Sequence, residues 1–231
     1  MRQIVLDTET TGLEVGKGHR IIEIGCIELS ERRPSGKRFH RYLNPQRPVD
    51  EGARSVHGIS DEFLADKPRF AEVAAEFLEF IAGAELVIHN AAFDVGFLDA
   101  ELVLADPGLG RIADHASVLD TLALAREKYP GQRISLDALC KRLNIDNRHR
   151  ELHGALLDAQ LLADVYLAMT GGQGDLGLAN QQATAPARVA AQSVARQPLR
   201  VRRADAAEAS LHEARLQAID KASRGRCLWR A

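Results

Sequence analysis

Two carboxylates one residue apart stand near the start of the chain, Asp7 and Glu9. In a strand, side chains two positions apart point to the same side, so both carboxylates would face one place. Like charges this close repel each other unless a cation lies between them. The pair therefore predicts a metal site, and a strand end with hydrated acids is the structural alternative.

Two later segments carry side chains of the same kind. Asp94 closes the run that starts at His89, at a predicted junction of strand and helix, where ligands gather in α/β sheets. An aspartate also favours a helix N-terminus for its own sake. His153 and Asp158 are five positions apart, which is about 140° around a helix. We therefore expect His153 to precede the helix that contains Asp158.

Four carboxylates and one histidine suit phosphodiester hydrolysis. Hard oxygen ligands select Mg²⁺ or Mn²⁺ over zinc, which prefers His and Cys. Two such ions about 4 Å apart bind the attacking water and the leaving 3′ oxygen together. A histidine, with an ordinary pKa of about 6.5, can take the proton of that water near neutral pH. The predicted metal ligands are Asp7, Glu9, Asp94 and Asp158, with His153 as the catalytic base.

The elements that must position these residues follow from periodicity. Strands are predicted over residues 3–6, 20–29, 37–43, 85–89 and 117–120, with Ile22, Ile24 and Cys26 on one face of the second. Helices are predicted over 70–81, 93–102, 135–143 and 154–169, and residues 44–58, rich in Pro, Asp and Gly, are predicted to form a loop. Three adjacent strands followed by alternating helices and strands predict an α/β domain with a mixed sheet and helices on its faces.

After Met169 the amino-acid composition of the chain changes. A stretch rich in Ala, Gln, Arg and Pro reads as a flexible linker up to about Ala204. A short helix over 206–222 and a tail with Trp229, the one tryptophan of the sequence, follow it. This side chain either docks on another protein or packs back onto the domain.

Composition and charge set the class of protein. The 231 residues are 45% hydrophobic and 27% charged, as in a soluble globular protein, and the 5% aromatic residues are too few for a surface that stacks many bases. The sequence has no apolar run that would cross a membrane or lead secretion, so we expect a cytoplasmic protein. Its three cysteines are expected to be reduced thiols. Residues 1–170 carry a net charge of −7, which gives little help in attracting phosphates.

The motifs together resemble the DEDD exonuclease superfamily, in its histidine branch. The matching segments are Asp7-Thr8-Glu9 with Thr10-Thr11-Gly12, the run from His89 to Asp94, and His153 with Asp158. The other branch has a tyrosine four residues before the last aspartate, where this chain has Gly154. All three motifs occur in order and at suitable separations.

Further segments resemble the proofreading (epsilon) subunits of bacterial DNA polymerase III, over nearly the whole chain. These segments are residues 56–59, 153–160, 166–172 and 227–231. The resemblance implies a ribonuclease-H-like fold, two Mg²⁺ or Mn²⁺ ions and removal of a mismatched 3′-terminal nucleotide of DNA. It assigns substrate contacts to Asp7, Glu9, His57 and Asp158. A nucleotide-contacting glutamate of the family has no match, because its position holds Gly52.

The same resemblance implies partners and divides the chain into three parts. Residues 1–172 would be the exonuclease domain, 173–204 a linker that binds the sliding clamp, and 205–231 a segment that binds the polymerase (alpha) subunit. Gln173, Leu176 and Leu178 fit a clamp-binding peptide, although an ordinary linker with two leucines reads the same way. Trp229 is the candidate contact with the polymerase. A small theta-like accessory subunit is a further partner that the resemblance allows.

Two other functions remain open at the level of sequence. The same chemistry would serve a stand-alone exonuclease for RNA or short oligonucleotides, since a contact with a 2′-hydroxyl has no motif of its own. The docking tail argues against this alternative. A non-catalytic scaffold between clamp and polymerase is the other alternative, and the complete set of acidic residues and histidine argues against it.

Overall fold

The computed structural model describes residues 1–148, 152–171, 204–224 and 229, in two units, Met1–Leu178 and Ala179–Ala231. The strands of the first unit are β1 (Arg2–Thr10), β2 (Ile21–Ser30), β3 (Arg33–Tyr42), β4 (Glu85–Ile88) and β5 (Ser117–Asp120). Its α-helices are α1 (Glu51–His57), α2 (Asp61–Leu64), α3 (Phe70–Ile81), α4 (Ala91–Ala105), α5 (Ile112–His115), α6 (Thr121–Lys128), α7 (Leu136–Leu143) and α8 (Ala155–Thr170). Two 3₁₀ turns, η1 (Val15–Lys17) and η2 (Pro107–Leu109), complete the described elements of this unit.

The strands form a mixed sheet, as predicted. Among the described residues the strand order is β3-β2-β1-β4-β5. The pairs β1–β2 and β2–β3 are antiparallel, while β1–β4 and β4–β5 are parallel. The carboxyl ends of β1, β4 and β5 consequently lie at the same edge of the sheet. This edge is where the acidic residues of the first two motifs stand.

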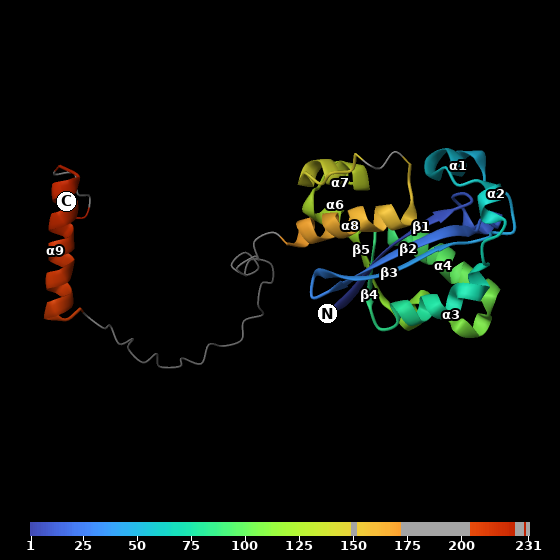
Figure 1. The fold of residues 1–231 in the computed structure, drawn as a ribbon, viewed down its shortest axis with the longest axis horizontal. Coiled ribbons are helices and arrows are strands. Elements are labelled where there is room, and N and C mark those ends of the chain that lie inside the picture. Colours follow the sequence, from blue (N-terminus) through green and yellow to red (C-terminus); the bar gives the residue numbers. More distant parts are fainter. Residues whose placement is uncertain (149–151, 172–203, 225–228, 230–231) are drawn as a thin grey trace, which may run out of the picture. The chain divides into compact units, whose positions relative to one another are not determined.

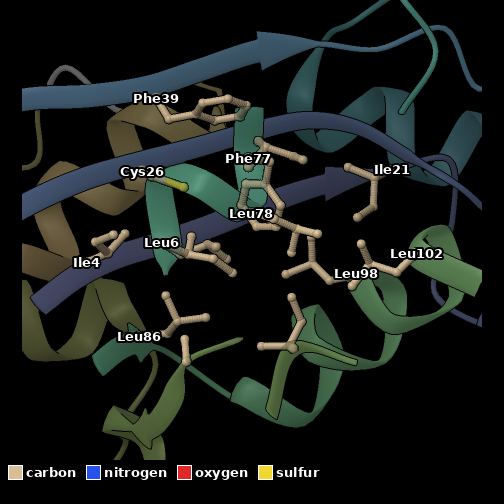
Figure 2. Close-up of a cluster of buried hydrophobic side chains, with 14 of the residues drawn as sticks. Ile4, Leu6, Ile21, Cys26, Phe39, Phe77, Leu78, Leu86, Leu98 and Leu102 are labelled. Carbon is tan, nitrogen blue, oxygen red and sulfur yellow. The ribbon is translucent and has the colours of Figure 1, made fainter. Parts of the chain in front are cut away.

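Helices cover both faces of the sheet (Figure 1). Side chains alternate along β1, so that Ile4 and Leu6 belong to a core with α3 and α4, shown in Figure 2, and Val5 belongs to a second core with α7 and α8. Phe39 of β3 closes the first core against Phe77 of α3, with ring centroids 5.6 Å apart. The sheet is therefore the rigid middle layer between the two sets of helices that carry Asp94 and Asp158.

One predicted face of β2 is wrong. Ile24 and Cys26 lie in the core with α3 and α4, but Ile22 packs in a separate cluster with Val49 and Leu64. The cause is a bulge, because Glu9 pairs with Glu23 while Thr10 pairs with Ile21, leaving Ile22 as an extra residue. A bulge reverses the side-chain alternation on its strand, which periodicity alone does not reveal.

The segment 44–58 is also more ordered than predicted. It contains α1, which begins after Asp50 and ends at His57, followed by the C-cap Gly58 with a positive φ of 73°. The short helix α6 was not predicted, since it follows β5 without an intervening loop. The strand Ser117–Asp120, the helix Phe70–Ile81 and the capping role of Ser135, whose side chain accepts a hydrogen bond from the Ala138 N–H, are confirmed.

A buried ion pair ties the start of β2 to α4. Arg20 donates two hydrogen bonds of 2.6 Å to Glu101, and the backbone N–H of Ile21 donates a third, of 3.2 Å. The Glu101 side chain is 2% exposed. Because α4 also carries Asp94, this contact fixes the helix that supplies one predicted metal ligand.

Glu101→Ala is expected to lower the free energy of unfolding by about 3 kcal/mol, because it leaves a partly buried guanidinium without its partner. The matched control is Glu76→Ala, which removes a pair with Arg41 whose carboxylate is 54% exposed. That change is expected to cost about 1 kcal/mol or less. Urea unfolding of both variants checks the difference, and equal losses would contradict it.

The second unit contains the predicted helix, α9 (Ala206–Ala222). Its N-terminus is capped by Asp205, which accepts hydrogen bonds from the N–H groups of Ala207 and Glu208. None of the residues of α9 is buried, and Trp229 is 80% exposed. No helix in the described ranges of the chain combines the length and apolar character needed to span a membrane.

Candidate active site

All five residues predicted for catalysis line one cavity of about 410 Å³. It opens at the edge of the sheet where β1, β4 and β5 end. The strand β1, the start of α4, the start of α7 and the residues around the start of α8 form its walls. The lining residues are Asp7, Thr8, Glu9, His89, Asn90, Phe93, Asp94, Leu122, Ser135, Leu136, Asp137, His153 and Asp158.

The alternation of β1 directs Asp7 and Glu9 toward α8. Val5, two residues before Asp7, packs in the core that α8 forms with this face of the sheet. Glu9, His153 and Asp158 each place one ligand atom within 4.8 Å of the other two, which makes them a possible metal site. The carboxylate pair of the first motif thus faces the histidine and aspartate of the third.

A glycine lets α8 approach the sheet at this point. A Cβ atom on Gly25 of β2 would lie 2.3 Å from the backbone carbon of Ala155 and the nitrogen of Leu156. Real Cβ atoms do not come this close, so a larger residue would push the first turn of α8 away. Gly25 therefore sets the depth at which Asp158, in that first turn, stands over β1 and β2.

His153 precedes α8, as the spacing predicted. Gly154 occupies the N-cap position and the helix begins at Ala155. The His153 side chain is 41% exposed, and its Nδ1 lies 3.2 Å from Oδ2 of Asp158, whose side chain is 4% exposed. The backbone N–H of His153 donates to the carbonyl of Val56 in α1, 3.1 Å away. The imidazole is thus within reach of solvent and of the buried carboxylate.

Asp94 lies on the other side of β1, in the first turn of α4. Thr8, which alternation places opposite Asp7 and Glu9, donates a hydrogen bond of 2.7 Å to its Oδ1. Burial raises the pKa of the Asp94 carboxyl to about 7, although the Thr8 hydroxyl opposes this shift. A cation bound beside this carboxylate would remove the cost of burying its charge.

This raised pKa predicts that Asp94 destabilises the metal-free protein. An unfolded aspartate has a pKa of about 3.9, so the unfolded chain releases its proton at lower pH than the folded chain does. The contribution of Asp94 to the free energy of unfolding therefore falls as the pH rises from about 4 to about 7, and it is most unfavourable above that range.

Asp94→Asn is expected to raise the Tm of metal-free protein by several degrees near pH 8 and to leave it nearly unchanged near pH 4. The isosteric amide can still accept the hydrogen bond from Thr8. Thermal unfolding in chelator at both pH values checks this. The same Tm for wild type and variant near pH 8 would contradict it.

The junction that carries Asp94 is supported by Asp120 and Thr121, which lie outside the motifs. Asn90 adopts a left-handed conformation (φ 66°) before α4, and its N–H donates to Oδ1 of Asp120 at the end of β5. His89 Nδ1 lies 3.0 Å from the hydroxyl of Thr121. Thr8 could have been found from strand alternation, and Asp120 from its place at the end of a neighbouring parallel strand.

A second cavity of about 410 Å³ adjoins the first, sharing Thr8, Glu9 and Phe93. Its other lining residues come from β1, the turn after it and α1: Thr10, Gly12, Leu13, Asp50, Gly52, Ala53, Val56 and His57. Both His57 and the position that holds Gly52 therefore face the same space. The α1 helix, which sequence periodicity missed, supplies four of these residues: Gly52, Ala53, Val56 and His57.

His57 offers a hydrogen-bond donor toward a ligand. Its Nδ1 accepts from the Ile59 N–H at 3.0 Å, and burial lowers its pKa, so the neutral ring carries its hydrogen on Nε2. The carbonyl of Thr10 lies near the ring and opposes the pKa shift, yet Nε2 has no partner with hydrogen-bond geometry among the described residues. A buried N–H without a partner is costly unless a ligand uses it.

The predicted tail contacts are only partly visible. Gln173, Leu176 and Leu178 lie outside the described residues, as does nearly all of the predicted linker 173–204. Trp229 is described and exposed.

Comparison with known proteins identifies close relatives. The Exonuclease (RNase_T) family model matches residues 4–166. DNA polymerase III subunit epsilon of Escherichia coli (strain K12) is 55% identical over 240 residues, which cover 100% of this chain and 98% of that protein. The protein of the same name from Pasteurella multocida (strain Pm70) is 53% identical over 236 residues, with 99% and 93% covered.

Solved structures share the fold. Exonuclease X in complex with 5′ overhanging duplex DNA is 25% identical with a TM-score of 0.59, over 74% of this chain and 93% of that one. Escherichia coli Exonuclease I in complex with a dA16 oligonucleotide is 18% identical with a TM-score of 0.63, over 74% of this chain and 41% of that one. The mixed sheet and its helices are therefore the ribonuclease-H-like fold of exonucleases.

Proposed function

The chain belongs to the Exonuclease family and, within it, to the epsilon subunits of DNA polymerase III, and from this we propose that its cavity removes 3′-terminal nucleotides from DNA with two divalent metal ions. The protein is thus a proofreading 3′→5′ exonuclease. The observation that carries the proposed site is the meeting of four carboxylates and a histidine, from three distant segments, in one cavity.

The donor set fits Mg²⁺ or Mn²⁺. The ligands would be Asp7, Glu9, Asp94 and Asp158, all oxygen donors of the kind these ions prefer. The raised pKa of Asp94 supports the fit, because a buried carboxylate is easier to ionise beside a cation. When bound, the ions would activate the attacking water and stabilise the leaving 3′ oxygen.

His153 serves as the general base in this proposal. Its ring lines the cavity beside Asp158 and is 41% exposed, so water can reach it. The contact with Asp158 orients the ring, and the hydrogen bond from its backbone to Val56 holds the residue at the rim. The residue thus stands where it can take a proton from water that enters the cavity.

The second cavity would receive the terminal nucleotide. Its walls are mostly apolar, and the Nε2 donor of His57, which lines this cavity, has no partner with hydrogen-bond geometry among the described residues. Asp7, Glu9 and Asp158 would contact the scissile phosphate from the adjoining cavity. Gly52 supplies no side chain at the position of the family's glutamate, so this position offers the nucleotide no carboxylate.

The tail would assemble the replicase. The epsilon subunits to which this chain is similar are named as subunits of DNA polymerase III, and we propose that residues 205–231 bind the polymerase (alpha) subunit through Trp229. The peptide with Gln173, Leu176 and Leu178 would bind the sliding clamp, and a theta-like subunit would bind the domain 1–172. We propose that the protein acts in the bacterial cytoplasm, where the chromosomal DNA lies. Tethering would offset the weak DNA affinity of an acidic domain by raising its effective concentration.

Excision assays on the purified complex test this function. The chain is combined with polymerase and clamp and given primers with matched or mismatched 3′ ends, in DNA and in RNA form. Faster removal of mismatched DNA ends is the expected result. Preference for RNA would favour the stand-alone exoribonuclease, and absence of hydrolysis would favour the scaffold. A fragment ending at residue 172 should digest DNA like the full chain when no partner is present.

A further inference from the structure

Three side chains of the cavity form a tighter group than the rest, namely Glu9, His153 and Asp158. Each places a ligand atom within 4.8 Å of the other two, and His153 Nδ1 lies 3.2 Å from Asp158 Oδ2. Two atoms that bind one zinc ion at about 2.0–2.1 Å, with angles of about 90–109°, are about 2.9–3.4 Å apart. The separation of these two atoms therefore already fits a shared zinc ion.

The group adds an imidazole nitrogen to two of the carboxylates proposed for catalysis. Mg²⁺ and Mn²⁺ favour oxygen ligands alone, whereas zinc binds imidazole nitrogen strongly, and divalent affinities for such mixed sites rise from Mn²⁺ to Zn²⁺. The His153 ring is 41% exposed, so an ion that enters the cavity reaches it without rearrangement of the core. We propose that Zn²⁺ binds through Glu9, His153 and Asp158, with the catalytic base itself as a ligand.

Zinc bound in this way inhibits the enzyme, a consequence that rests on the proposed role of His153. Zinc bound at Nδ1 leaves the hydrogen of the neutral imidazole on Nε2, which is the nitrogen that accepts the proton of water while Nδ1 contacts Asp158. Coordination therefore leaves no acceptor for the proton of water. Zinc also binds the carboxylates of Glu9 and Asp158, which would hold the catalytic Mg²⁺ ions. It therefore competes with Mg²⁺ and does not replace the base.

Metal binding by the full chain tests the site without reference to activity. Zinc affinity is measured by calorimetry, and Co²⁺ absorption reports a nitrogen ligand. His153→Gln is expected to weaken zinc binding by about 10–100-fold or more and to leave Mn²⁺ binding nearly unchanged. His89→Gln is the matched control, because His89 lines the same cavity but lies outside the group. Equal zinc affinity of His153→Gln and wild type would overturn the site.

An activity measurement separates this inference from the proposed function. Hydrolysis of a DNA strand at constant Mg²⁺ is followed while Zn²⁺ is added, and a chelator selective for zinc is added afterwards. Full inhibition that the chelator reverses is the expected result. If zinc binds through His153 and hydrolysis continues, the zinc site stands and the role of His153 as base is overturned.

Discussion

Asp158→Asn is expected to reduce hydrolysis of DNA 3′ ends by about a thousandfold or more, with little change in fold. The variant keeps the shape of a side chain that is 4% exposed but removes the charge that would hold a metal ion. Loss of several kcal/mol of transition-state stabilisation by the metal corresponds to this factor. Release of nucleotides from a 5′-labelled single strand measures it, and Asp7→Asn is expected to behave in the same way.

Asp164→Asn is the matched control, since it changes an aspartate of the same helix that lines neither cavity. It should retain the activity of the wild type. Binding to the polymerase subunit should survive in all three variants, because the proposed contact lies in the C-terminal segment. Wild-type hydrolysis by Asp7→Asn or Asp158→Asn would show that the metal assignment is wrong.

His153→Ala is expected to lower kcat by about 10²–10⁴-fold, the usual contribution of a positioned general base. Its side chain is partly exposed and its backbone contact with Val56 does not depend on the ring, so the fold should persist. Single-turnover hydrolysis with saturating Mn²⁺ isolates the chemical step from metal binding.

His115→Gln provides the comparison for that variant. His115 hydrogen-bonds the carbonyl of Leu109 and lines neither cavity, so this change should leave kcat near the wild-type value. A His153→Ala variant with a similar kcat would mean that another group accepts the proton.

Sequence predicted best those elements whose stability is local. The helix Phe70–Ile81 has a regular apolar stripe, and Ser135 gives a hydroxyl cap to a helix that the chain begins there. The helix α1 was missed because its seven residues lack such a stripe and are held by distant contacts, such as the hydrogen bond from the His153 N–H to the Val56 carbonyl. Tertiary contacts decide the structure of segments this short.

In the candidate site, too, the sequence predicted local features but not those that depend on tertiary contacts. Residue type and spacing were enough to bring Asp7, Glu9 and Asp94 to one cavity, and a helix-angle argument placed His153 outside its helix. The bulge at Ile22 and the support that Asp120 gives to Asn90 depend on which strands are neighbours. A single sequence does not specify that pairing, so these features required the structure.

The cavity draws its first acids from β1 and its last from α8, the elements that open and close the described part of the first unit. During synthesis the ribosome releases β1 long before α8, so a growing chain holds only part of the site. On the proposed assignment of the ligands, the metal site would be complete only when α8 packs on the sheet.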